Sequence, residues 1–113
     1  MASSAQDIKE EPFVVIARMD VKPGKVDVVA QHIANMKARA DSDQEPGTLR
    51  YDVVRYGDSF HFFEVYKDHE SFNKHTAENP IYQEIKQDIA DFVDPLVISF
   101  WEMGKLPKPT VTF

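Results

Sequence analysis

Residues 47–82 read GTLRYDVVRYGDSFHFFEVYKDHESFNKHTAENPIY, and this stretch decides the fold. Within it, Thr48–Tyr56 and Phe60–Lys67 are rich in β-branched and aromatic residues that alternate with polar ones, a pattern typical of strands. The segment between them, Gly57 to Ser59, is short enough for a hairpin loop. The stretch therefore predicts two neighbouring antiparallel strands.

The second half of the stretch has the signals of a helix that is interrupted once. Asp68 suits the cap position before a short helix that carries Phe72 and His75 on one face. Asn79 followed by Pro80 then suits a fresh cap with proline at the first helical position. The helix after it is predicted to turn its apolar residues inward, namely Ile81, Tyr82, Ile85, Ile89 and Phe92.

The flanking segments complete the order of elements. Pro12–Val21 and Leu96–Met103 read as strands, and Val26–Ala40 has the apolar spacing of a long amphipathic helix. The resulting order is β-α-β-β-α-β, with the second helix split at Pro80. We therefore predict an α+β fold with a ferredoxin-like split βαββαβ arrangement and an antiparallel sheet.

The 113 residues are enough for one domain. Residues 1–11 are small and polar without periodicity, so we expect a disordered N-terminal arm. Residues 12–104 form the predicted domain, and residues 105–113 are expected to be an extended C-terminal tail.

Composition excludes several classes of function. The formal net charge is -6 and no cluster of Lys and Arg occurs, which argues against a nucleic-acid partner. The absence of cysteine removes disulfides, thiolate nucleophiles and the usual zinc sites. No apolar run approaches the ~20 residues needed to cross a bilayer. We expect a soluble, cytoplasmic protein that binds no membrane.

The strands carry large apolar groups on both faces. On the second strand of the hairpin, Phe62 and Tyr66 face one way while Phe63 and Val65 face the other. A sheet covered on one face only should alternate apolar with polar residues. The second face is therefore expected to pack against a second copy of the chain, giving a homodimer.

A set of residues in and just before this stretch occurs in the order and spacing of a known family. The set comprises Glu45-Pro46-Gly47, then Tyr51, Val53 and Arg55, then Phe63-Glu64-Val65-Tyr66, and finally Asp68, Phe72, His75 and Tyr82. In this combination the chain resembles the antibiotic biosynthesis monooxygenase family, within the dimeric α+β barrel superfamily. Two positions depart from the pattern: Tyr66 stands where relatives often have Trp, and Ile81 stands close to where many relatives carry a second His.

The resemblance implies a monooxygenase that needs no cofactor and acts with molecular oxygen on a quinol, an anthrone or a similar aromatic, polyketide-like molecule. His75 would be the general base, because imidazole titrates near neutral pH, and Glu64 would be the second catalytic residue by orienting it. The expected substrate-binding residues are Tyr51, Tyr66, Phe72, Asn79, Tyr82 and Trp101.

Plainer structural roles stay open for these residues. His75 could be a core histidine bonded to a backbone carbonyl or to Glu64, and Glu64 could pair with Arg50 or Arg55. Asn79 also suits a helix cap. The remaining histidines, His32, His61 and His69, lie on different predicted elements without metal-ligand spacing, so no metal site is expected.

Other functions also stay open. The main alternative is a non-catalytic dimeric barrel that binds a small hydrophobic ligand or acts in a stress response. An isomerase or cyclase using the same pocket is another, and haem degradation is a weaker one.

Overall fold

The computed structural model describes residues 2–112, and its order of strands and helices is the predicted one. The elements are the 3₁₀ turn η1 (Ala5–Asp7), β1 (Phe13–Asp20), α1 (Val26–Ala40), β2 (Thr48–Tyr56), β3 (Ser59–Tyr66), α2 (His69–His75), α3 (Pro80–Phe92) and β4 (Val97–Glu102). The hairpin loop is one residue shorter than expected, because β3 already begins at Ser59. Gly57 in this loop has a φ of 59°, a conformation that glycine adopts without strain.

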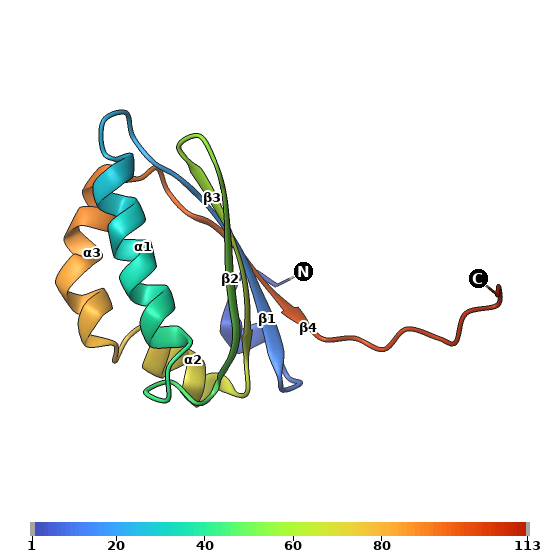
Figure 1. Ribbon diagram of the computed structural model, residues 1–113. Coiled ribbons are helices and arrows are strands. Elements are labelled where there is room, and N and C mark those ends of the chain that lie inside the picture. Colours follow the sequence, from blue (N-terminus) through green and yellow to red (C-terminus); the bar gives the residue numbers. More distant parts are fainter. Residues whose placement is uncertain (1, 113) are drawn as a thin grey trace.

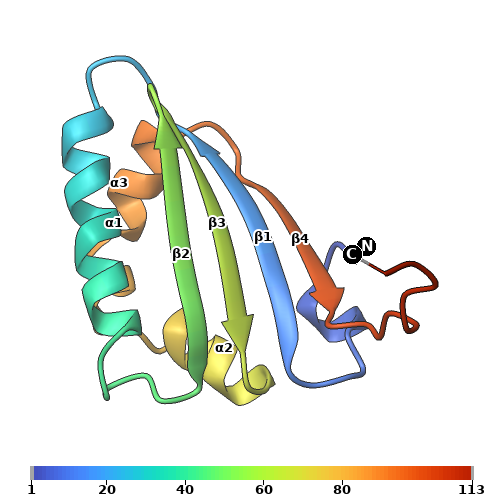
Figure 2. The same cartoon turned by 45° about the vertical axis from the view of Figure 1, so that its right-hand side comes forward.

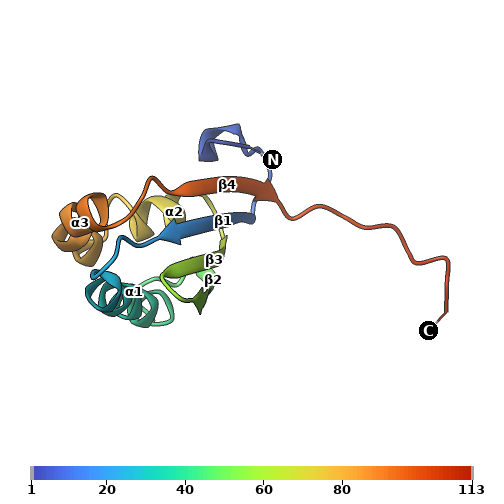
Figure 3. The same ribbon diagram turned by 90° about the horizontal axis from the view of Figure 1, so that it is seen from above.

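The four strands form one sheet in the order β2-β3-β1-β4, and every neighbouring pair is antiparallel. All three α-helices lie on the same side of this sheet, as Figures 1 and 2 show. Seen from above, no α-helix of residues 2–112 lies over the opposite side of the sheet (Figure 3). The architecture is the predicted ferredoxin-like α+β arrangement with two layers.

The helices begin where the sequence provides caps. The Asp68 side chain accepts a hydrogen bond from the backbone N–H of Ser71 and starts α2. The Asn79 side chain accepts from the N–H of Ile81, and Pro80 takes the first position of α3. The break between the two helices is therefore encoded locally, and it leaves His75 at the end of α2.

The core lies between the sheet and the helix layer. Val29 and Ile33 of α1 pack with Met19, Phe62 and other side chains from the helix-covered face of the sheet. A second cluster joins Ile8, Phe13, Val15, Tyr66 and Phe100 at the end of the sheet nearer α2.

The N-terminal segment differs from the disordered arm that the sequence led us to expect. The backbone of Ala2 exchanges two hydrogen bonds with Phe100, at 2.9 and 2.8 Å, and so pairs with the outer edge of β4. Ile8 is buried in the second cluster, and the His69 ring bonds the carbonyl of Ala5 at 2.8 Å. The segment is ordered because it satisfies an open strand edge and buries an apolar side chain. Met1 lies outside the described residues.

The C-terminal segment leaves the body of the protein after β4 and runs extended with exposed side chains through residue 112 (Figure 1). The last residue of the expected tail, Phe113, lies outside the described residues. Within residues 2–112, no helix has the length and apolar character that crossing a membrane requires.

Candidate active site

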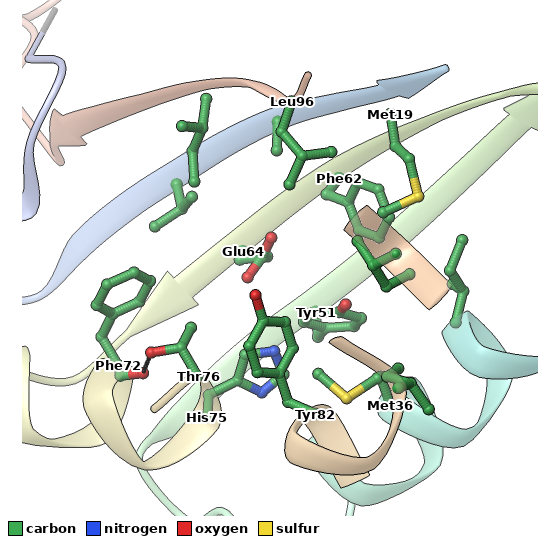
Figure 4. Close-up of a pocket in the computed structure, with 16 residues that line it drawn as sticks. Met19, Met36, Tyr51, Phe62, Glu64, Phe72, His75, Thr76, Tyr82 and Leu96 are labelled. Atoms are coloured by element: carbon green, nitrogen blue, oxygen red, sulfur yellow. Dashed lines mark hydrogen bonds between the residues drawn. The ribbon is translucent and has the colours of Figure 1, made fainter. Parts of the chain in front are cut away.

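A cavity of about 180 Å³ lies between the helix layer and the sheet (Figure 4). Its walls are almost entirely apolar, and the few polar side chains among them are Tyr51, Glu64, His75, Thr76 and Tyr82. The apolar lining consists of Val15, Ala17, Met19, Ile33, Met36, Phe62, Phe72, Ile85, Ile89, Leu96 and Ile98. A largely apolar cavity with a few convergent polar groups is the usual form of a small-molecule site.

His75 is buried, with 3% of its surface exposed, and its ring lies among aromatic neighbours. The centres of the Tyr51 and Tyr66 rings lie 4.9 and 5.6 Å from the centre of the imidazole. Its Nδ1 lies 2.6 Å from a carboxylate oxygen of Glu45. The partner expected for a structural histidine, a backbone carbonyl or Glu64, is therefore not the one observed. The carboxylate that orients the ring is Glu45 and not Glu64, which accepts from Tyr66 instead.

Glu45 lies in the loop between α1 and β2 and is 5% exposed. Besides His75, it is paired with Arg39 at 3.0 Å and accepts a hydrogen bond from the Thr48 hydroxyl at 3.0 Å. Burial by itself would raise the pKa of Glu45, but the hydrogen bonds and positive charge around it outweigh burial and lower the pKa. The carboxyl is thus held ionised.

Sequence reasoning did not single out Glu45 as a site residue. Glu45 belongs to the Glu45-Pro46-Gly47 motif. An acidic residue directly before this turn was the one feature of the sequence that could have marked it as a site residue. Nothing local indicates that this carboxylate reaches a histidine 30 positions along the chain.

Glu64 projects from β3 into the cavity and is 8% exposed. The hydroxyl of Tyr66 donates a hydrogen bond to it. Burial raises the pKa of the Glu64 carboxyl above its ordinary value, although the bond from Tyr66 acts in the opposite direction. In Figure 4 the hydroxyl of Tyr82, on α3, is directed toward this carboxyl.

The alternative in which Glu64 pairs with Arg50 or Arg55 is not the one observed. Arg50 pairs with Asp52, two residues along the same strand, and the Arg55 guanidinium donates to the carbonyl of Gly57. Both arginines thus have other partners, and Glu64 keeps only the tyrosine hydroxyl within residues 2–112.

Five of the eight predicted site residues line one cavity: Tyr51, Glu64, Phe72, His75 and Tyr82. Tyr66 and Asn79 lie next to it but are not part of its lining. Tyr66 is fully buried and acts through its bond to Glu64, whereas Asn79 caps α3 and directs its amide toward the sulfur of Met36 at 3.5 Å.

Trp101 does not belong to this cavity. It pairs across the sheet with Val14, whereas its neighbour Phe100 pairs with Val15, which lines the cavity. Because successive residues of a strand point to opposite faces, Trp101 lies on the face away from the helices. Its indole N–H donates to the Ser99 hydroxyl at 2.8 Å.

Among residues 2–112, no three His, Cys, Asp or Glu side chains are grouped so that they could hold a metal ion. The acid–base groups of the cavity are Glu64 and the pair formed by His75 and Glu45. Such a pair can accept a proton from a molecule in the cavity. The raised pKa of Glu64 favours the neutral form of its carboxyl, which can donate a hydrogen bond.

Comparison with known proteins gives a family match and several structural matches. The family model for antibiotic biosynthesis monooxygenases matches residues 12–88. No curated protein matches the chain.

Three of the similar solved structures illustrate how far the fold is shared. Rv0793 from Mycobacterium tuberculosis has a TM-score of 0.72 at 19% identity, over 88% of this chain and 100% of that one. PA3566 from Pseudomonas aeruginosa has a TM-score of 0.71 at 17% identity, over 84% and 97%. NE2512 from Nitrosomonas europaea, a protein of unknown function, has a TM-score of 0.67 at 22% identity, over 87% and 96%. At these identities the likeness shows the shared fold.

Proposed function

The chain belongs to the antibiotic biosynthesis monooxygenase family, and from that membership we propose a monooxygenase that needs no cofactor and acts on a quinol, an anthrone or a similar aromatic molecule. The observation that carries this proposal is the buried contact of 2.6 Å between His75 and Glu45 at the wall of an apolar cavity. It provides a base beside a cavity whose walls are almost entirely apolar.

In the proposed reaction, His75 removes a proton from the substrate. The electron-rich anion that results reduces molecular oxygen directly, and a carbon–oxygen bond forms. For an anthrone-type CH₂ group, one oxygen atom ends in the new carbonyl and the other leaves as water with both hydrogens. The four electrons that reduce oxygen come from the two C–H bonds of the substrate, so no other reductant is needed.

Glu64 is the proposed hydrogen-bond donor for the substrate oxygen. Burial raises the pKa of this carboxyl, which favours its neutral form and leaves a proton to donate. Tyr66 already donates to one of its oxygens. A donor that faces developing negative charge in a dry site stabilises the transition state more than it would in water.

The cavity volume sets the size of the substrate. An apolar cavity of about 150 Å³ is known to hold one benzene molecule, and the cavity here is about 180 Å³. The cavity therefore has the size of a one-ring molecule such as a simple quinol. A three-ring anthrone requires the helix layer to move, or a part of the molecule to project past Ile89 of α3 and Leu96 just before β4, which also line a neighbouring pocket.

Non-catalytic binding of a small hydrophobic ligand is the second candidate function. It is favoured by the apolar lining and by the engagement of polar groups within the protein: the Tyr66 hydroxyl is used by Glu64, and Asn79 is used as a helix cap. An isomerase or cyclase would use the same base and the same cavity.

We also propose that the protein is a homodimer joined through the uncovered face of the sheet. Large apolar side chains are accessible there: Val54 and Val97 are each 66% exposed, and Ile16, Phe63 and Trp101 are exposed on the same face. Packing two such faces together would bury them. Light scattering should give twice the chain mass, and Val97→Asp should shift it toward the monomer.

Oxygen uptake tests the catalytic proposal. The protein is freed of metals and mixed with a panel of one-ring quinols and with anthrone. Oxygen consumption is expected with at least one of them, and His75→Gln should reduce its rate by about 10²-fold or more. His32→Gln is the matched control, since His32 bonds Asp88 between α1 and α3 and does not line the cavity.

If His75→Gln kept full turnover on every accepted substrate, the role of the base would be wrong. If no substrate were consumed while aromatic ligands still bound, the non-catalytic alternative would replace the oxygenase.

A further inference from the structure

We propose that Glu45 is a positioning residue that fixes the tautomer of His75, so that Nδ1 carries the proton and Nε2 is left to accept one from a molecule in the cavity. The proposal rests on the function proposed for His75, but it can be tested in the absence of any substrate.

The distance between Glu45 and His75 indicates which atom holds the proton that they share. Glu45 Oε1 and His75 Nδ1 are 2.6 Å apart, which is short even for a charge-assisted hydrogen bond. Both side chains are at least 95% buried, so water does not compete for either group. A carboxylate has no proton to give, and the proton in this bond must therefore belong to Nδ1.

The residues around Glu45 hold its carboxylate in one orientation. Arg39, in the last turn of α1, lies 3.0 Å from Oε2, and Thr48, the first residue of β2, donates to Oε1. These contacts and the bond from His75 also lower the pKa of Glu45 against the effect of burial. The loop between α1 and β2 thus presents a fixed negative charge to the end of α2.

The second ring nitrogen of His75, Nε2, is available to a molecule in the cavity. Within residues 2–112 no hydrogen bond involves Nε2 of His75, although the residue lines the cavity. When Nδ1 holds the proton, the lone pair of the neutral ring lies on Nε2. A histidine whose second nitrogen is oriented by a carboxylate is the arrangement that makes the first nitrogen an effective base.

Glu45→Gln is the informative substitution, because the neighbours dictate how the amide will lie. The Arg39 guanidinium can only donate, so it will draw the amide oxygen toward itself. The amide NH₂ then faces His75 and donates to Nδ1. This places the ring proton on Nε2, and the tautomer is reversed without a large change in shape.

Nitrogen-15 NMR of the histidine rings measures this directly. In the pH range where the ring nitrogen shifts themselves show a neutral His75, the unmodified protein should show the proton on Nδ1, and Glu45→Gln should show it on Nε2. The signals of His75 are those missing from the spectrum of His75→Gln. Asp88→Asn is the matched control, since it removes the carboxylate partner of His32 and should leave the His75 signals unchanged.

If the Glu45→Gln variant does not fold, the spectrum of the unmodified protein alone tests the inference. A neutral His75 ring protonated at Nε2 would overturn it, and so would a ring that keeps both protons at every pH at which the protein is folded. An unchanged tautomer in a folded Glu45→Gln variant would overturn it as well.

Turnover provides the second readout and separates this inference from the proposed function. Where a substrate is oxidised, Glu45→Gln should lower kcat by about 10²-fold, as expected for the loss of a general base, while KM changes by less than about threefold because the cavity wall is intact. Asp88→Asn should retain the kcat of the unmodified protein. If no substrate were oxidised by the unmodified protein, the proposed function would fail, and the NMR result would still decide the role of Glu45.

Discussion

The Tyr66→Phe substitution removes one hydroxyl from the interior and tests the contact between Tyr66 and Glu64. Tyr66 is completely buried, and its ring packs 5.2 Å from Phe72 and 6.0 Å from Phe13 between ring centres. Phenylalanine keeps these contacts, so the only loss is the bond donated to the carboxyl of Glu64.

The expected loss of stability comes from the Glu64 carboxyl, which stays buried without the hydroxyl that bonded it. Glu64 is 8% exposed and would lose its protein donor, and leaving a buried polar group unsatisfied costs about 1–3 kcal/mol. We therefore expect Tyr66→Phe to lower the free energy of unfolding by about 2 kcal/mol. For a chain of this length that corresponds to a Tm lower by roughly 6–12 °C.

Urea unfolding at a fixed protein concentration, with an unchanged slope, measures the loss. Tyr82→Phe is the control: its hydroxyl has no bonding partner within residues 2–112, and the change should be below about 0.5 kcal/mol. The decisive comparison repeats Tyr66→Phe in a Glu64→Leu background. There the acceptor is absent, so removing the hydroxyl should cost nothing or stabilise the protein. An equal cost in both backgrounds would refute the contact.

Three further predictions concern the same region. Because burial raises the pKa of Glu64, the folded protein keeps a proton at pH values where the unfolded chain has already released it. The free energy of unfolding should therefore fall as the pH rises from the ordinary glutamate pKa through the raised one. Urea midpoints measured across this pH range should show the fall, and Glu64→Gln should lack it. Gly47→Ala would place a methyl group 1.8 Å from the Ser71 hydroxyl and should cost about 1–3 kcal/mol in thermal unfolding, most of which Ser71→Gly should restore in the double variant. Asn79→Ala removes the cap of α3 and should lower stability by about 1–2 kcal/mol, whereas Asn79→Asp should retain most of it if the cap is the reason.

The fold could be predicted from the sequence because its signals are local. Alternating strands, the short loop at Gly57 and the caps at Asp68 and Asn79 each act over a few residues, and the structure contains all of them. The N-terminal segment could not be predicted in this way. Its order depends on pairing between Ala2 and Phe100, which are separated by nearly the whole chain.

The candidate site could be predicted only in part. His75 and Glu64 were identifiable because the residue types and the family pattern point to them, and both line the cavity. Trp101 was misplaced because β4 is apolar on both faces, so its sequence does not reveal which side turns toward the helices. That choice is made by its pairing with β1, where Phe100 lies opposite Val15.

What the sequence by itself determined is the order of strands and helices, the family, and the presence of an acid–base residue on a short helix between two caps. What only the tertiary structure decided is which groups meet: Glu45, from a loop, reaches His75, and Tyr66 satisfies Glu64 in place of an arginine. The physical reason is that turns and helix caps depend on residues only a few positions apart, so the local sequence specifies them. The partner of a buried charge, in contrast, depends on how distant elements pack, and no local pattern records it.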